Sequence, residues 1–242
     1  MNSNYAVRRK KMNKLQRLAN IFVSPEQCFG SIRDEGKNWA DYVIPLVLLV
    51  LMIVLMLTMT SDIMEKIQTE TIMKMNQLTQ EQKEAALQQM NSPLVNVFKY
   101  VSSAITIVLT VLFTALVFMV VGNFIGGGEQ KYGTLLVSAL YIQLITIPES
   151  IIKMILMLQK ESVNVYVGLA SFVARPELSS FGFQFLAQFE FFKIWRILLW
   201  VLAFHVLYKF NVRKSALLVV ITMLLGMLIA ALWTSVSMGR AM

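Results

Sequence analysis

The sequence predicts an all-helical membrane protein, a polytopic bundle of about five transmembrane helices, from its composition and from the length of its apolar segments. Of its 242 residues, 57% are hydrophobic and 15% are charged, whereas soluble domains have roughly 45–50% apolar and about 25% charged residues. The apolar residues gather in long blocks such as 43–59 and 104–121, and about 20 such residues in a helix cross a bilayer core. These blocks lack the regular polar stripe of a helix on a soluble protein.

Five segments have the length and composition of a membrane-spanning helix. The third is interrupted by Pro148, which we expect to kink its helix because proline has no amide proton to donate. We expect residues 43–236 to form one membrane domain behind a cytoplasmic head, residues 1–42. The predicted spans are 43–60, 94–125, 134–158, 189–208 and 215–236.

The head combines a basic run with two short amphipathic helices. Leu15, Leu18 and Phe22 recur at helical spacing. Ser24 and Pro25 then predict a second helix, with serine as the N-cap and proline at the first helical position. We expect both helices to lie on the inner membrane surface; the alternative is that they pack on another cytoplasmic protein. The basic run consists of Arg8, Arg9, Lys10, Lys11, Lys14 and Arg17.

Two connecting segments lie between the spans. Residues 61–93 are polar with apolar residues at helical spacing, and Thr79 with Gln82 forms a capping box, so we expect a helical hairpin outside the membrane. Residues 159–188 are apolar and rich in phenylalanine, but Arg175-Pro176 interrupts them. They are too short for another crossing, and we expect an interfacial or re-entrant loop.

The net charge of +8 comes from basic residues that flank apolar spans. They concentrate in the first forty positions and in the turn 209–214, which is the positive-inside pattern and not a basic groove with interleaved aromatic residues. We therefore expect no nucleic-acid partner. With five spans, this pattern places the N-terminus in the cytoplasm and the C-terminus outside. The absence of any Asn-x-Ser/Thr sequon fits the cytoplasmic (inner) membrane of a bacterium.

A series of short motifs runs through residues 14–236 in a fixed order. It consists of LANIFVSPEQCF at 18–29, Trp39, Pro45, Gly126-Gly127, Tyr132, Tyr141, Pro148, EFFKIW at 190–195 and KSA at 214–216. In this order the chain resembles the Yip family of Ypt/Rab-interacting membrane proteins, in its bacterial form. One departure is Glu190, where bacterial relatives typically have aspartate; the acidic group is retained.

The resemblance implies a five-span fold with a cytoplasmic N-terminus, in agreement with the charge pattern. It also implies partners: eukaryotic relatives bind Rab-type GTPases and act in vesicle traffic, and a bacterial relative is associated with an ABC-type exporter. It implies no catalytic activity and no cofactor.

Charged residues within the spans are candidates for function, because each costs roughly 2.5–3.5 kcal/mol at the bilayer centre. Helical rise places Glu149, Arg196, Lys153 and Lys99 in the outer third of the membrane, and we expect one intramembrane polar cluster. Glu149 would pair with Arg196 or with Lys153 one turn along its helix, and would anchor a water-accessible pocket beside Pro148. The alternative is that the cations extend to the outer headgroups.

Small residues recur every four positions in the second and fifth spans. Such stripes allow close approach of helices in lipid, and we expect two helix-packing faces, with contact between them as one option. The alternative is a polar permeation path. The stripes are Ser102, Thr106, Thr110 and Thr114, and Thr222, Gly226, Ala230 and Thr234.

Catalytic and metal-binding motifs are lacking in the sequence. One histidine, His205, excludes a site with two histidine ligands, and we expect it to be a hydrogen-bonded packing residue; the alternative is a proton relay. The single cysteine, Cys28, is expected to be an inert interfacial residue, with palmitoylation as the alternative. The segment GGGEQKYG at 126–133 lacks the Gly-Lys-Ser/Thr ending of a phosphate-binding loop and is expected to be a flexible turn.

These observations favour a non-enzymatic membrane scaffold or adaptor without cofactor or metal. Its expected partners are the lipid bilayer and other membrane proteins, or further copies of itself. The alternative function is an accessory subunit of an ABC-type exporter, or a small transporter that uses the region around Glu149. In that case the hairpin 61–93 would dock the partner.

Overall fold

The computed structural model describes residues 12–35, 37–90, 92–174 and 176–241, with side chains through Met238. Two parts of the sequence predictions lie outside the described residues. They are Arg8, Arg9, Lys10 and Lys11 of the basic run, and Arg175 of the Arg175-Pro176 pair that interrupts the apolar segment 159–188.

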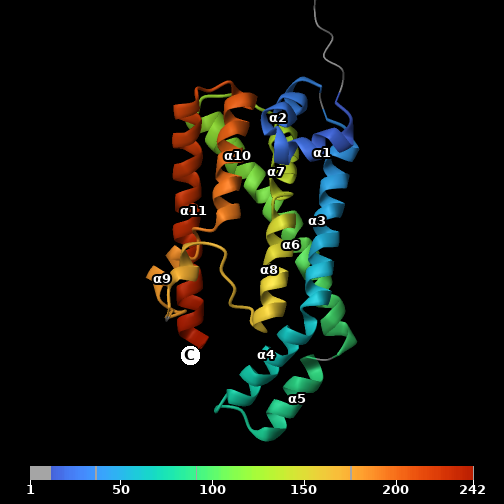
Figure 1. The fold of residues 1–242 in the computed structure, drawn as a ribbon, viewed down its shortest axis with the longest axis vertical. Helices are drawn as coiled ribbons and strands as arrows, with labels where there is room; N and C mark the ends of the chain where they lie inside the picture. The colour runs from blue at the N-terminus through green and yellow to red at the C-terminus, as the bar shows by residue number, and fades with distance from the viewer. Residues whose placement is uncertain (1–11, 36, 91, 175, 242) are drawn as a thin grey trace, which may run out of the picture.

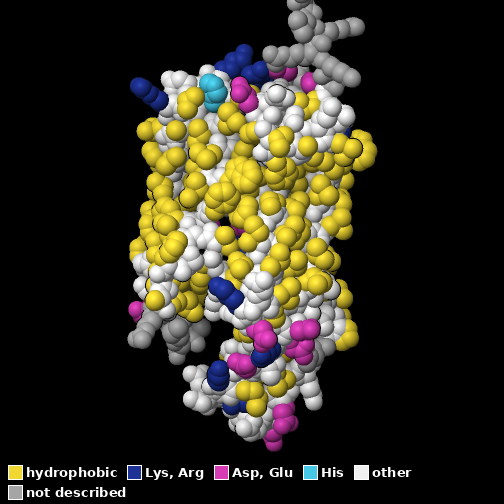
Figure 2. Space-filling view, in the orientation of Figure 1, with side chains coloured by type: hydrophobic (Ala, Val, Ile, Leu, Met, Phe, Trp, Pro, Cys, Tyr) yellow, Lys and Arg dark blue, Asp and Glu magenta, His cyan; other side chains and the backbone are white. Residues whose placement is uncertain are grey.

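Among the described residues, five helical segments are long and apolar enough to cross a membrane, so the five-span prediction is confirmed. They lie side by side along the long axis of the molecule (Figure 1), and on the face that Figure 2 shows, apolar side chains cover them between two charged ends. The segments are α3 (Trp39–Met59), α6 (Pro93–Val120) with the π-helix η1 (Val121–Ile125), α7 (Tyr132–Gln143) with α8 (Thr146–Lys160), α10 (Phe191–Tyr208) and α11 (Val212–Ala241).

The third span breaks into α7 and α8 three residues before the predicted kink. Pro148 cannot donate to the carbonyl of Leu144, and its ring crowds that carbonyl. The chain therefore tightens at Leu144 and Ile145, whose amides bond to carbonyls three residues back, at 3.1 and 3.2 Å. The proline therefore places the interruption in the turn before itself, and Pro148 lies in the first turn of α8.

The α7 helix forms the centre of the bundle. Thr134, Leu135 and all residues from Val137 to Ile142 are buried. Around it, Phe118 of α6 stacks on Trp200 of α10 with ring centroids 3.9 Å apart, and Trp200 is fully enclosed. Large buried aromatic side chains dominate the energetics of a protein core, so this contact fixes α6 against α10.

The two amphipathic head helices are present as α1 (Lys14–Val23) and α2 (Pro25–Asp34), at one end of the bundle (Figure 1). The apolar face of α2 is covered by α7 and α10 of the same chain, and Cys28, Phe29 and Ile32 belong to the main core. The sequence predicted that this face contacts either the membrane surface or another cytoplasmic protein, whereas it contacts helices of its own chain. The α1 helix still exposes Leu15 and Val23, at 77% and 74% of their surface, so lipid contact stays a prediction for α1.

The hairpin α4 (Ser61–Lys74) and α5 (Gln80–Met90) projects from the opposite end of the bundle, as Figure 1 shows. The segment 161–190 contains η2 (Leu169–Phe172) and the short helix α9 (Phe181–Leu186), which packs on α11. No helix of spanning length lies in this segment among the described residues. Its placement relative to the membrane stays a prediction.

The glycine-rich segment after η1 is tightly held, so the prediction of a flexible turn is wrong. The side chain of Asn123 both donates to and accepts from the backbone of Gln130, at 3.0 Å each. Lys214 Nζ donates to the carbonyl of Gly126 at 2.6 Å. A Cβ at Gly128 would lie 2.3 Å from Tyr208 Cδ1, so glycine here serves close packing.

Candidate functional site

Glu149 stands at the centre of an ion-paired group in the lower half of the bundle. Lys153 lies one turn after it on α8, at the i, i+4 spacing that brings helical side chains together. Its Nζ forms an ion pair with Glu149 Oε1 at 2.9 Å. The guanidinium of Arg196, from α10, pairs with the other carboxylate oxygen. The Glu149 side chain is 9% exposed, so its charge is compensated within the protein and not by water.

Glu190 completes the group, which we name the polar cluster: Glu149, Lys153, Glu190 and Arg196. Glu190 precedes α10, and its Oε2 accepts from Lys153 Nζ at 2.8 Å. Sequence reasoning noted this acid as a family feature but did not place it in the cluster. The net charge of the predicted cluster could have indicated a further acid. Glu149 was the one acid predicted beside Arg196, Lys153 and Lys99, and a membrane interior penalises unpaired charge.

Lys99 does not join the polar cluster. Its side chain is half-buried, and no ion pair between described residues includes it. Extension toward the headgroups remains the prediction for Lys99 alone. For Lys153 and Arg196 the structure instead provides carboxylate partners inside the chain. A functional role for the cluster, and a pocket beside Pro148, remain proposals.

A backbone contact positions Glu190. Gly168 forms an isolated antiparallel bridge with Glu190. On either side of it, the Leu169 amide donates a hydrogen bond to the Phe189 carbonyl, and the Phe191 amide donates one to the Val167 carbonyl, both at 3.1 Å. A Cβ on Gly168 would lie 2.2 Å from the Phe189 carbonyl oxygen and 2.7 Å from Glu190 Cα. Glycine is therefore required for the segment 161–190 to approach the start of α10.

We expect Gly168→Ala to destabilise the protein by about 2 kcal/mol, because backbone atoms must move and such overpacking typically costs 1–3 kcal/mol. A thermal unfolding assay in detergent measures the effect as a lowered midpoint. Gly182→Ala is the matched control, since its nearest neighbour, Ser180 Oγ, is 3.7 Å from the added Cβ. Equal midpoints for the two variants would contradict the bridge.

A second buried ionic network fixes the head to the bundle. Asp41, the third residue of α3, is fully buried and accepts from Arg17 at 2.8 Å and from Lys14 at 2.6 Å. Tyr141 of α7 donates to the same carboxylate at 3.3 Å, and Arg17 also reaches Glu35 at 3.3 Å. The sequence assigned Arg17 to the basic run of the head without an acidic partner, whereas 1% of its surface is exposed and it pairs with Asp41.

The two small-residue stripes do not pack against each other as one interface in the described chain. The α11 helix packs mainly on α10 and α9, through the buried residues Ser215, Val219, Met227 and Ala231. Thr106, Thr110 and Gly226 are exposed, while Ser102, Thr114, Thr222, Ala230 and Thr234 are half-buried. Ser102, Thr106 and Thr110 line a small hollow together with Ile53 of α3 and Gln143 of α7. The role of both stripes as packing faces stays a prediction.

We expect Gly226→Leu to leave the thermal midpoint of the isolated chain unchanged or slightly raised. A Cβ there meets nothing within 4 Å, and leucine favours a helix over glycine by roughly 0.7 kcal/mol. The measurement is thermal unfolding of detergent-purified monomer beside a size measurement in lipid. A lowered monomer midpoint would show that the face packs within the chain.

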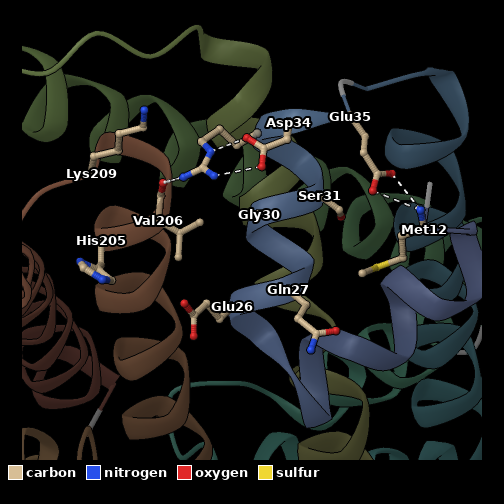
Figure 3. A pocket seen from close by; sticks show the side chains of 11 residues that line it. Met12, Glu26, Gln27, Gly30, Ser31, Asp34, Glu35, His205, Val206 and Lys209 are labelled. Carbon is tan, nitrogen blue, oxygen red and sulfur yellow. Dashed lines mark hydrogen bonds and ion pairs between the residues drawn. The ribbon is translucent and has the colours of Figure 1, made fainter. Parts of the chain in front are cut away.

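A groove runs over the outer face of α2 at the head end of the molecule; we name it the head groove. Its volume is about 1020 Å³, and Figure 3 shows α10 along one side of α2 and Met12 along the other. His205, on the α10 side, bonds through Nδ1 to the Phe210 carbonyl at 2.6 Å. The lining consists of Met12, Glu26, Gln27, Gly30, Ser31, Arg33, Asp34, Glu35, His205, Val206 and Lys209.

Charged groups of the head groove pair with its own walls. Arg33 donates to both carboxylate oxygens of Asp34, at 2.6 and 3.0 Å, and to the carbonyl of Val206 at 2.8 Å. The Asp34 carboxylate raises the pKa of Arg33 above its ordinary value. Glu26 points into the space between α2 and α10 (Figure 3), and no ion pair between described residues includes it.

Cys28 lies on the opposite, buried face of α2, and burial raises the pKa of its thiol to about 12. A thiol in this state is a poor nucleophile. No group of three histidine, cysteine or acidic side chains in the described part of the chain is close enough to hold a metal ion.

The five apolar segments and charged ends define a polytopic, multi-pass membrane protein. The Yip1 domain model matches residues 19–234, and the chain therefore belongs to the Yip1 family, a family of non-enzymatic membrane proteins. The family prediction is confirmed. Comparison with curated proteins gives no match, and comparison with solved structures gives none either.

Proposed function

We propose that the protein is a non-enzymatic scaffold or adaptor that binds a membrane-protein partner through its head groove. The observation that supports this most is the groove itself, about 1020 Å³ in volume and lined with charged side chains. Specific interfaces combine a fixed surface with polar groups that set orientation. The Arg17–Asp41 network supplies the fixed surface by holding the head on α3.

The proposed orientation places the head groove in the cytoplasm and the α4–α5 hairpin outside, in a bacterial inner membrane. Basic residues support it, because several lie in the head, in the loops at its end of the bundle or in the first turn of α11: Lys37, Lys131, Lys209, Arg213 and Lys214. Residues 61–93 contain five acidic and three basic side chains. Lysine and arginine favour the cytoplasmic side of short loops.

Photo-crosslinking in native membranes tests the adaptor role. A crosslinking residue at Gln27, which lines the groove, should capture one integral membrane protein, and Glu26→Lys should reduce the yield at least severalfold. The same residue at Gln88 on α5 is the positional control. Capture that is insensitive to Glu26→Lys would contradict the proposal.

The alternative, an accessory subunit of an ABC-type exporter or a small transporter, is favoured by two features. One is the exposed α4–α5 hairpin, and the other is the polar cluster within the spanning region. Crosslinks from Gln88 to a transporter subunit would support the accessory role. Solute flux in proteoliposomes that is lost in Glu149→Gln would support transport.

A further inference from the structure

A small hollow lies between α3, α6 and α7 in the middle of the spanning region; we name it the mid-span hollow. Its volume is about 220 Å³, and its lining side chains are all uncharged. Helical rise places Gln143 about 16 Å from Tyr132, the first residue of its span, which is mid-depth in a hydrocarbon core of about 30 Å. The lining consists of Ile53, Ser102, Ser103, Thr106, Ile107, Thr110 and Gln143.

Gln143 brings a carboxamide to this depth without a hydrogen-bond partner. Between the residues that the structure describes, no hydrogen bond includes the Gln143 or the Thr110 side chain. Ser103 and Thr106, by contrast, bond back to carbonyls of their own helix, at 2.7 and 2.8 Å. Gln143 is half-buried, and the exposed part of a side chain at this depth meets lipid, which offers no hydrogen bond. A polar group from another molecule would satisfy this carboxamide.

The size and chemistry of the mid-span hollow favour a side chain of another protein chain over a free ligand. Small-molecule pockets have volumes of about 300–1,000 Å³, and this hollow is smaller. Its neutral lining offers no counter-charge to an ion, which is costly at this depth. Carboxamide and hydroxyl groups both donate and accept, so one face holds both halves of a hydrogen bond. Such a face is self-complementary, which is the requirement for contact between two copies related by a twofold axis.

The surface of α6 around the hollow allows two copies to approach closely. Ser102, Thr106 and Thr110 recur every four residues, and small residues at this spacing let helix backbones approach in lipid. The next row of α6 consists of bulky apolar side chains that can pack around the contact in place of lipid. They are Ile105, Leu109 and Phe113, exposed by 53, 59 and 67%.

We propose that the mid-span hollow is a homodimer interface, in which the Gln143 carboxamide of each copy hydrogen-bonds to the carboxamide and hydroxyl groups of the other copy's hollow. The contact satisfies two polar groups that lipid leaves unbonded. The head groove takes no part in it, so this inference goes beyond the proposed adaptor role. A twofold axis along the membrane normal leaves both head grooves on one side of the membrane, and the dimer then offers a partner two binding sites.

Energy transfer between labelled copies in liposomes tests the proposal. Gln88→Cys on α5 carries the donor or the acceptor dye, and the native Cys28 is buried and contributes no labelling. Stepwise dilution of the protein with phosphatidylcholine gives the dimerisation constant. Gln143→Leu should weaken dimerisation at least about tenfold, because the change removes the contact from both copies. Thr110→Val, which removes one hydroxyl from each copy, should weaken it less.

Thr222→Val on α11 is the matched control. Its hydroxyl bonds to the Leu218 carbonyl of its own helix at 2.7 Å, so the dimerisation constant should not change. Gln143→Asn keeps a carboxamide and should retain more of the dimer than Gln143→Leu. In detergent, Gln143→Leu should leave the thermal midpoint unchanged or raised, because the side chain has no partner in the described part of the chain. This measurement separates a lost interface from a misfolded protein.

Oxidative crosslinking in the same liposomes locates the contact. Leu109→Cys should form a disulfide-linked dimer, and Ile229→Cys on α11, 68% exposed in the native side chain, should not. Crosslinking at Ile229 in place of Leu109 would overturn the proposal. Energy transfer no higher than random proximity gives would overturn it too, as would a dimerisation constant that Gln143→Leu leaves unchanged.

The two proposals can fail separately. Neither the liposome measurements nor their variants involve the head groove, so their failure leaves the adaptor proposal standing. Failure of the photo-crosslinking test at Gln27 likewise leaves the homodimer interface standing.

Discussion

Asp41→Ala is expected to destabilise the protein by about 3–5 kcal/mol, the usual cost of removing one partner from a buried ion pair. Arg17 would keep 1% exposure and lose its closest carboxylate, with Glu35 at 3.3 Å as the remaining one. Asp41 also accepts from the Asn38 amide at 2.9 Å, so the start of α3 loses one half of its capping box. Chemical unfolding in detergent, followed by tryptophan fluorescence, measures the loss.

The matched control for this prediction is the double variant Arg17→Met with Asp41→Leu. Apolar replacement of both members of a buried pair is often neutral, so the double variant should recover most of the loss. If the double variant were as unstable as Asp41→Ala alone, the ion pair would not be the cause. Lys14→Met should matter less, because its side chain is 31% exposed and can reach solvent.

Reversal of the charges of Glu149 and Arg196 gives the second large effect. Glu149→Arg should cost about 3 kcal/mol or more, because it places a third cation beside Arg196 and Lys153 in a poorly solvated region. Arg196→Glu should be similarly harmful, since it leaves two carboxylates close together. The combined variant restores opposite charges, and we expect it to recover at least half of the loss.

A double-mutant cycle in thermal or chemical unfolding measures the coupling between the two residues. Lys193→Met is a matched control on α10: the Lys193 ammonium bonds to the neutral Gln188 side chain at 2.6 Å. Its removal should be tolerated better than the loss of Arg196. Additive effects of the two reversals would contradict a direct pair between Glu149 and Arg196.

The number and order of the helices follow from the sequence because lipid imposes a simple rule: long apolar runs become spanning helices. Local chemistry also gives the start of α2 at Pro25. The contact between Arg17 and Asp41 was not predictable from local signals. Arg17 and Asp41 are 24 residues apart, and a basic side chain beside other basic residues reads as solvent-exposed. Only the docking of the head on α3 makes it a buried partner.

The polar cluster was predictable in part, for a similar reason. The i, i+4 spacing of Glu149 and Lys153 can be read directly from the sequence, and the helical rise brings Arg196 to a similar depth. Glu190 requires the bridge to Gly168, which depends on the path of residues 161–190. Gly126 and Gly128 read as a loop signal, whereas a Cβ would lie 2.6 Å from the Gly122 carbonyl oxygen at the first and 2.3 Å from Tyr208 Cδ1 at the second.

Labelling of cysteines at the two ends of the bundle with a membrane-impermeant maleimide tests the account most directly. In intact cells, Gln88→Cys on α5 should react, while Arg213→Cys at the start of α11 should react only after permeabilisation. The native Cys28 is buried and contributes no background. Reaction of both positions from the same side would contradict the five-span path and the cytoplasmic head groove together.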